Sequence, residues 1–161
     1  MQSGVGSWKS GVAMLSESAR MSSAAEAKFR LPAPASVARV VTVIGLDPAG
    51  EEVVARLALT PWPGVRFFPA LALTDEGALE DIADGDLVVM VVAAGADAGA
   101  AARIGRACSD RRVHTATFVL RDASTTDAAL SATLAQVRPW SLMVVIASDR
   151  DYVGDLLRSF R

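Results

Sequence analysis

The sequence predicts an α/β fold, a three-layer Rossmann-like arrangement around a mainly parallel sheet of about five strands. The first observation is that short runs rich in Val and Ile alternate with helical segments along residues 38–161. The second is that the run at residues 87–94 is apolar throughout, as a strand covered by helices on both faces must be. Together they predict a doubly wound sheet with right-handed crossovers and residues 87–94 near its centre.

Each predicted strand is a short run of β-branched and apolar residues bounded by turn residues. Pro69 lies in the second run and places that strand near an edge of the sheet, because proline cannot donate to a central ladder. The predicted strands are residues 38–44, 65–73, 87–94, 113–120 and 142–147.

Each predicted helix follows one of these strands. The first carries its apolar side chains on one stripe, has Asp47 or a neighbour as its cap, and ends at a Pro-Trp-Pro segment. The second is only a short helical or turn segment, and the fourth has Thr125 or Thr126 as its cap. The predicted helices are residues 51–59, 79–82, 100–109, 126–137 and 151–160.

Composition limits the classes of function. A chain of 161 residues, of which 52% are hydrophobic, buries one core. A net charge of −2 and an aromatic content of 6% give neither a basic surface nor many stacking side chains, so we expect no nucleic-acid or membrane partner. Cys108 is the only cysteine, so an intrachain disulfide and a multi-cysteine metal site are excluded. These features predict a cytoplasmic protein.

The chain divides into two parts by composition. Residues 1–35 are rich in Ser, Ala and Gly and end in a Pro-containing segment, which predicts a flexible leader. Residues 36–161 carry all the predicted strands and helices and are expected to form a single α/β domain.

Glycines follow two of the predicted strands, where the ligand site of an open parallel sheet lies. Gly45, Gly50, Gly95 and Gly99 would let backbone N–H groups face a phosphate or a carboxylate. Alternatively, these glycines only turn the chain between strand and helix. The spacing lacks the middle glycine of a dinucleotide fingerprint, and no Lys-Ser/Thr pair follows, so both readings stay open.

Aspartates gather at the same predicted edge, namely Asp47, Asp97, Asp149 and Asp151. Clustered carboxylates can hold Mg²⁺ together with bridging phosphates. Helix capping is the more frequent role of Asp after a strand, so we predict no metal site here. His114 is the only histidine, and no spacing indicates a nucleophile–base pair, so no catalytic residue is assigned.

The order of these elements over residues 39–157 resembles the nucleotide-binding domain of the FtsZ/tubulin family. Residues 41–45 look like that family's first strand and glycine loop, and residues 64–68 resemble its second strand. Residues 83–95 are similar to the acidic turn, strand and glycine that enter its signature loop. Residues 142–150 resemble the strand that ends in an Asn-Asp-Arg/Lys-type triplet. The resemblance implies an FtsZ/tubulin-like fold for this domain.

The sequence departs from that family where phosphates are held. The signature loop is shortened to residues 96–100 and carries Asp97, whose charge repels phosphate, and Pro48 removes a donor from the first loop. Residues 123–127 replace the family's ribose-contacting segment, and the chain ends at Arg161, before the family's central helix and catalytic domain. We therefore expect neither GTP hydrolysis nor filaments.

The leading interpretation is a degenerate FtsZ-like domain that is not an enzyme and acts as a protein-interaction or regulatory module. Its expected partner is itself or another protein, and no cofactor is expected. The alternative is a small-ligand domain that binds a nucleotide or another anion through the glycine turns. A Rossmann-type enzyme ranks third, because both the fingerprint and an acid–base pair are missing.

A homodimer is also expected. Without the family's central helix, apolar surface should be exposed near the last strand, around Trp140, Leu142 and Tyr152. Leu156 and Phe160 of the terminal helix would cover it only in part. A two-fold dimer that includes this C-terminal segment is the commonest way to bury such a patch.

Overall fold

A computed structural model describes residues 39–69 and 73–160, and the predicted leader at residues 1–35 lies outside them. Ala38–Arg161 form one compact unit, while the exact start predicted for the domain stays a prediction. The strands of this unit are β1 (Val41–Gly45), β2 (Val65–Phe68), β3 (Leu87–Ala93), β4 (His114–Leu120) and β5 (Met143–Ala147). The α-helices are α3 (Pro48–Leu57), α4 (Glu76–Ile82), α5 (Ala100–Arg111), α6 (Asp127–Val137) and α7 (Asp151–Ser159).

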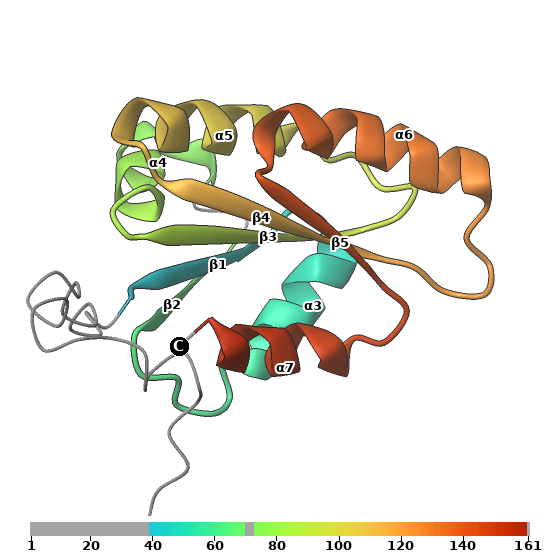
Figure 1. Ribbon diagram of the computed structural model, residues 1–161, viewed down its shortest axis with the longest axis horizontal. Coiled ribbons are helices and arrows are strands. Elements are labelled where there is room, and N and C mark those ends of the chain that lie inside the picture. Colours follow the sequence, from blue (N-terminus) through green and yellow to red (C-terminus); the bar gives the residue numbers. More distant parts are fainter. Residues whose placement is uncertain (1–38, 70–72, 161) are drawn as a thin grey trace, which may run out of the picture. The chain divides into compact units, whose positions relative to one another are not determined.

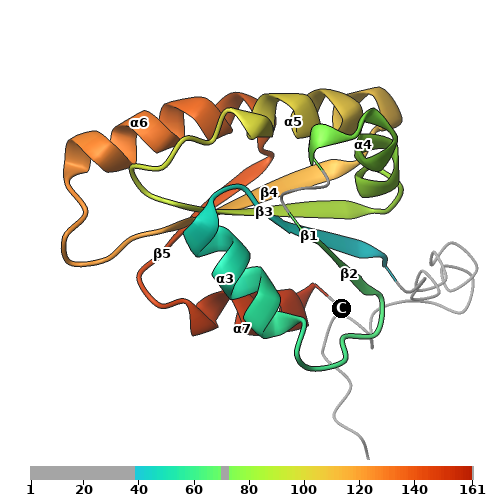
Figure 2. The same cartoon turned by 180° about the vertical axis from the view of Figure 1, so that it is seen from behind.

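The strands form one parallel sheet in the order β2-β1-β3-β4-β5, so the predicted fold class is confirmed. This is the flavodoxin-like order, in which the chain reverses its winding direction between β1 and β3. Helices α4, α5 and α6 cover one face of the sheet, and α3 and α7 cover the other (Figures 1 and 2). The result is the expected three-layer arrangement.

Strand β3 lies at the centre of the sheet, as predicted. Its side chains alternate between two apolar clusters: Val88, Met90 and Val92 join the cluster under α4, α5 and α6, and Val89 and Val91 join the one under α3 and α7. All five are fully buried. A run that is apolar at every position is therefore explained by helices on both faces.

Cys108 lies in the first of these clusters, on the inner face of α5. Its side chain is buried, and desolvation raises the pKa of the thiol to about 11. The thiol is therefore neutral at physiological pH and acts as a small apolar side chain.

Several predicted boundaries are off by two residues or more, and local chemistry explains three of them. Helix α3 begins at Pro48 rather than at residue 51, because Asp47 caps it and proline fits the first turn. Strand β2 ends at Phe68, directly before Pro69, instead of continuing to residue 73. Helix α4 begins at Glu76 rather than at residue 79, because the Asp75 side chain accepts a hydrogen bond from Gly77 N.

Candidate functional site

The loops that carry six of the seven candidate site residues lie side by side at the carboxyl ends of β1 and β3. Gly45 of β1 pairs with Val91 of β3, and Leu46 N donates to the Val91 carbonyl at 2.9 Å. Asp149, the seventh candidate, follows β5, which is separated from β3 by β4. The structure thus brings together Gly45, Asp47, Gly50, Gly95, Asp97 and Gly99 at the point where the winding reverses, with Asp149 on the far edge.

Asp47 joins these two loops. One oxygen of its carboxylate, Oδ1, accepts from Gly50 N at 2.9 Å and from Ala93 N at 3.1 Å. A negative charge at the N-terminus of α3 is stabilised by the helix dipole. The carboxylate therefore occupies the position in which an anion would meet the first turn of this helix.

Gly45 and Gly50 are required by close packing. A Cβ atom at Gly50 would lie 2.1 Å from the Val91 carbonyl oxygen, and one at Gly45 would lie 2.4 Å from Glu51 N. The first turn of α3 thus packs directly against the backbone of β3. The interpretation of these glycines as turn and packing residues explains both positions without a ligand.

The loop between β3 and α5 is held by side chains of α6. Gly95 N donates to Thr133 Oγ1 at 2.8 Å, and Ala98 N donates to Gln136 Oε1 at 2.6 Å. Thr133 Oγ1 in turn donates to the Ala96 carbonyl at 3.3 Å. This loop corresponds to the one expected to face a ligand, and two of its backbone donors are bonded to α6.

Asp97 and Asp149 also bond within their own loops. Asp97 Oδ1 accepts from Gly99 N at 2.9 Å, and Asp149 Oδ1 accepts from Asp151 N at 2.9 Å. All three candidate aspartates therefore accept backbone hydrogen bonds at or next to a helix start. Helix capping of this kind is the role that we predicted for these aspartates in preference to Mg²⁺ binding.

Sequence reasoning missed Thr133 and Gln136. Thr133 is fully buried on the side of α6 that also buries Leu130, Leu134 and Val137. A hydroxyl in an apolar stripe is the one signal that could have pointed to it, because a buried polar group needs a partner. Gln136 is exposed and gives no such signal.

Arg150 pairs with a distant residue rather than with Asp149 or Asp151 on either side of it. Its guanidinium donates to Glu52 Oε2 of α3 at 2.9 Å. The same carboxyl group lies 3.5 Å from Arg56, which is 3.7 Å from Asp151. These pairs connect the start of α7 to α3 through exposed side chains, and pairs of this kind contribute little to stability.

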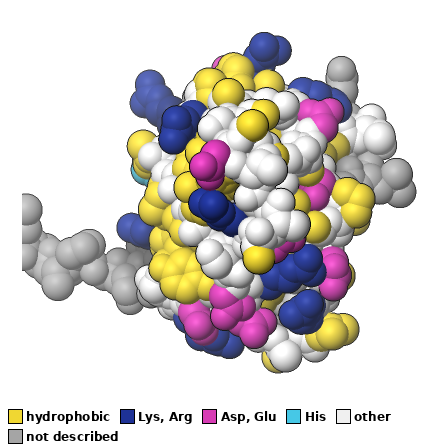
Figure 3. Space-filling model, turned by 90° about the vertical axis from the view of Figure 1, so that its right-hand side faces the viewer, with side chains coloured by type: hydrophobic (Ala, Val, Ile, Leu, Met, Phe, Trp, Pro, Cys, Tyr) yellow, Lys and Arg dark blue, Asp and Glu magenta, His cyan; other side chains and the backbone are white. Residues whose placement is uncertain are grey.

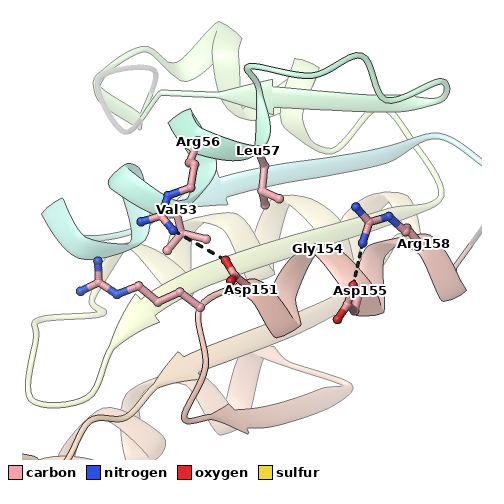
Figure 4. A pocket seen from close by; sticks show the side chains of 8 residues that line it. Val53, Arg56, Leu57, Asp151, Gly154, Asp155 and Arg158 are labelled. Carbon is pink, nitrogen blue, oxygen red and sulfur yellow. Dashed lines mark hydrogen bonds and ion pairs between the residues drawn. The ribbon is translucent and has the colours of Figure 1, made fainter.

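A pocket of about 190 Å³ lies between α3 and α7 (Figure 4). Figure 4 shows Arg56 directed toward Asp151 and Arg158 toward Asp155. The arginines that line the pocket are thus paired with carboxylates of the same surface, and Arg150 is paired with Glu52. An anion would have to compete with these carboxylates.

A second hollow, of about 320 Å³, lies where β5 runs into α7. Its charged lining residues are Asp149 and Asp155, both acidic, beside the apolar surface of Ile146 and Tyr152. A lining of this kind repels phosphate and suits an apolar side chain better.

Within residues 39–69 and 73–160, no three His, Cys, Asp or Glu side chains are grouped to hold a metal ion. Likewise, none of the helices in this part of the chain has the length and apolar character needed to cross a bilayer.

Comparison with protein-family models and with curated proteins finds no match to this chain. The resemblance to the FtsZ/tubulin family therefore stays a hypothesis that rests on the motifs. Ligand binding by the seven candidate residues also stays a prediction. The geometry adds a condition to it: an anion that binds the amides of Gly50, Ala93, Gly95 or Ala98 must displace Asp47 or the α6 side chains.

Proposed function

We propose that this domain is a degenerate, non-hydrolysing FtsZ-like domain that acts as a protein-interaction or regulatory module in the cytoplasm. The observation that carries the proposal is that the strand-end loops bond to the protein itself. Gly50, Ala93, Gly95, Ala98 and Gly99 donate their N–H groups to side chains of Asp47, Thr133, Gln136 and Asp97.

Phosphate binding by a glycine loop depends on backbone N–H groups that point at the ligand. In this chain, carboxylates accept three of these five hydrogen bonds, from Gly50, Ala93 and Gly99. Each carboxylate accepts a hydrogen bond from a backbone N–H group that a phosphate would need. It also adds a negative charge close to where the phosphate would lie. Internal bonding and repulsion therefore act in the same direction, against a nucleotide.

The proposed role instead uses the outer surface. Leu142, Met143, Ile146 and Tyr152 of the last strand and its neighbours are exposed to solvent. Neighbouring exposed apolar side chains of this kind are typical of a protein-interaction surface. The partner in this proposal is a second copy of the chain or another protein.

Two measurements test the proposal: the melting temperature with a panel of nucleotides, with and without Mg²⁺, and the rate of GTP hydrolysis. A ligand at 100 times its Kd stabilises a protein by about 2.7 kcal/mol. For a domain of this size, that raises the melting temperature by about 10 °C. We expect no rise and no turnover above the protein-free rate.

Turnover that disappears in Gly99→Val would overturn the proposal, because the variant alters only the loop before α5. A higher melting temperature without turnover would favour the alternative function instead, a small-ligand domain that binds a nucleotide or another anion at the glycine turns.

A further inference from the structure

The two edges of the sheet differ in how they are protected. Strand β2, at one edge, contains Arg66 and is followed by Pro69. The Arg66 guanidinium turns inward and donates to Thr42 Oγ1 and to the Asp81 carbonyl, each at 3.0 Å. Charged residues and proline are the usual means of preventing an edge strand from pairing with another chain.

Strand β5, at the other edge, has neither means of protection. Residues 142–148 contain no charged residue and no proline, and no described strand lies beyond β5. The exposed fractions of Leu142 and Ile146 are 74% and 46%. β5 lies toward the viewer in Figure 1 and so on the left in Figure 3, where hydrophobic side chains gather.

The outer backbone groups of β5 can be assigned from its bonds to β4. The Ala147 carbonyl accepts from Arg121 N at 2.8 Å, so Ala147 directs its backbone groups toward β4. Because this direction alternates along a strand, Val144 and Ile146 direct their N–H and C=O groups outward. These groups are available to another strand.

We propose that β5 pairs with β5 of a second copy of this chain, antiparallel about a two-fold axis, so that the two sheets become continuous. This inference rests on the proposed function and specifies its partner. With the axis at Val145, Val144 of each copy faces Ile146 of the other, and each pair exchanges its outward hydrogen bonds. Only uncharged residues then meet along the strand.

The charges at the two ends of β5 favour the antiparallel arrangement. Arg138 precedes the strand and Asp149 follows it, and both are exposed. Among the described residues, Arg138 forms no ion pair. Antiparallel pairing brings the basic end of each copy toward the acidic end of the other, and the symmetry repeats this attraction.

The hollow at the end of β5 provides a complementary surface. Met143 lies on the same side of the strand as Val145 and Ala147, which pack toward α7. In the antiparallel pair, Met143 of one copy lies beside Ala147 of the other. Met143 therefore reaches the hollow of the other copy, which is lined by Ala147, Tyr152 and Ile146. This contact would bury the exposed methionine side chain against apolar residues.

Sedimentation equilibrium of the full chain at micromolar concentration tests this inference. We expect twice the 16.8 kDa mass of one chain for the wild type. Ile146→Lys should shift the chain to monomer and weaken association at least about tenfold, because two unpaired ammonium groups would enter the interface. Leu59→Lys, at a leucine with 82% exposure outside β5, is the matched control and should remain a dimer.

A second variant and a second readout separate edge pairing from misfolding. Leu142→Lys also changes an exposed position and should dissociate the dimer without lowering the helix content seen by circular dichroism. In the wild type, hydrogen exchange at the Val144 and Ile146 amides should slow as protein concentration rises, and in Ile146→Lys it should not.

A monomeric wild type, or a dimer that persists in both Ile146→Lys and Leu142→Lys, would overturn the pairing. Neither result bears on the nucleotide measurements. The proposed function would then remain valid, with a different protein as the partner. Conversely, GTP turnover would overturn the proposed function and leave the dimer intact.

Discussion

Val89→Asp is expected to abolish the folded protein. Val89 lies in the central strand, is fully buried and packs into the cluster under α3 and α7. An unpaired carboxylate there costs several kcal/mol, against a total stability of about 5–15 kcal/mol for a domain. Expression should yield insoluble chain, and circular dichroism of any soluble fraction should lack the native helical signal.

The control for this change is Leu59→Asp, the same new side chain at a leucine that is largely exposed. This variant should be soluble, with a melting temperature close to that of the wild type. A folded Val89→Asp protein with undiminished stability would mean that β3 is not in the core.

Gly50→Ala should destabilise the domain by about 3 kcal/mol or more, at the upper end of the usual cost of overpacking. The added methyl group would lie 2.1 Å from the Val91 carbonyl oxygen and 2.9 Å from Asp47 Oδ1. Backbone cannot yield as a flexible side chain can, so α3 must move away from β3. Urea unfolding measures the loss as a lower midpoint with an unchanged slope.

Gly77→Ala is the matched control, since Gly77 also lies in the first turn of a helix. Its Cβ would meet nothing closer than the Asp75 side chain at 3.5 Å. This variant should be neutral or slightly stabilised, because alanine favours a helix over glycine. Equal stability of the two variants would contradict the close contact between α3 and β3.

The sequence predicted the layers and the central strand because a strand that is buried on both faces is apolar at nearly every position. A run such as residues 87–94 has no polar position and needs cover on both faces. Capping residues predicted the starts of helices less precisely. Asp47 was recognised as a candidate cap, but the helix was still expected to begin three residues later than it does.

Contacts between distant residues were not predictable from spacing. The bonds from α6 to the β3–α5 loop join Gly95 to Thr133 and Ala98 to Gln136, residues 38 positions apart in each pair. The pair Arg150–Glu52 spans 98 positions. Only the packing of helices on the sheet decides which side chain reaches which backbone group.

The predicted apolar surface near the last strand is present in part. Leu142 and Tyr152 are exposed as expected, whereas Trp140 is half-buried against α5. A Cβ at Gly105 would lie 2.6 Å from the Trp140 Cβ, so the glycine makes room for this contact. The sequence could not reveal this contact, because Gly105 and Trp140 are far apart in the chain and only the packing of α5 brings them together.

The most direct test of the central claim, that the strand-end amides are bonded internally, is a titration of ¹⁵N-labelled protein with GTP and Mg²⁺. We expect that the amide resonances of Gly50, Ala93 and Gly95 do not move as nucleotide is added. Saturable shifts at these three amides would contradict it, because they would mean that a ligand displaces Asp47 and Thr133 from the loops.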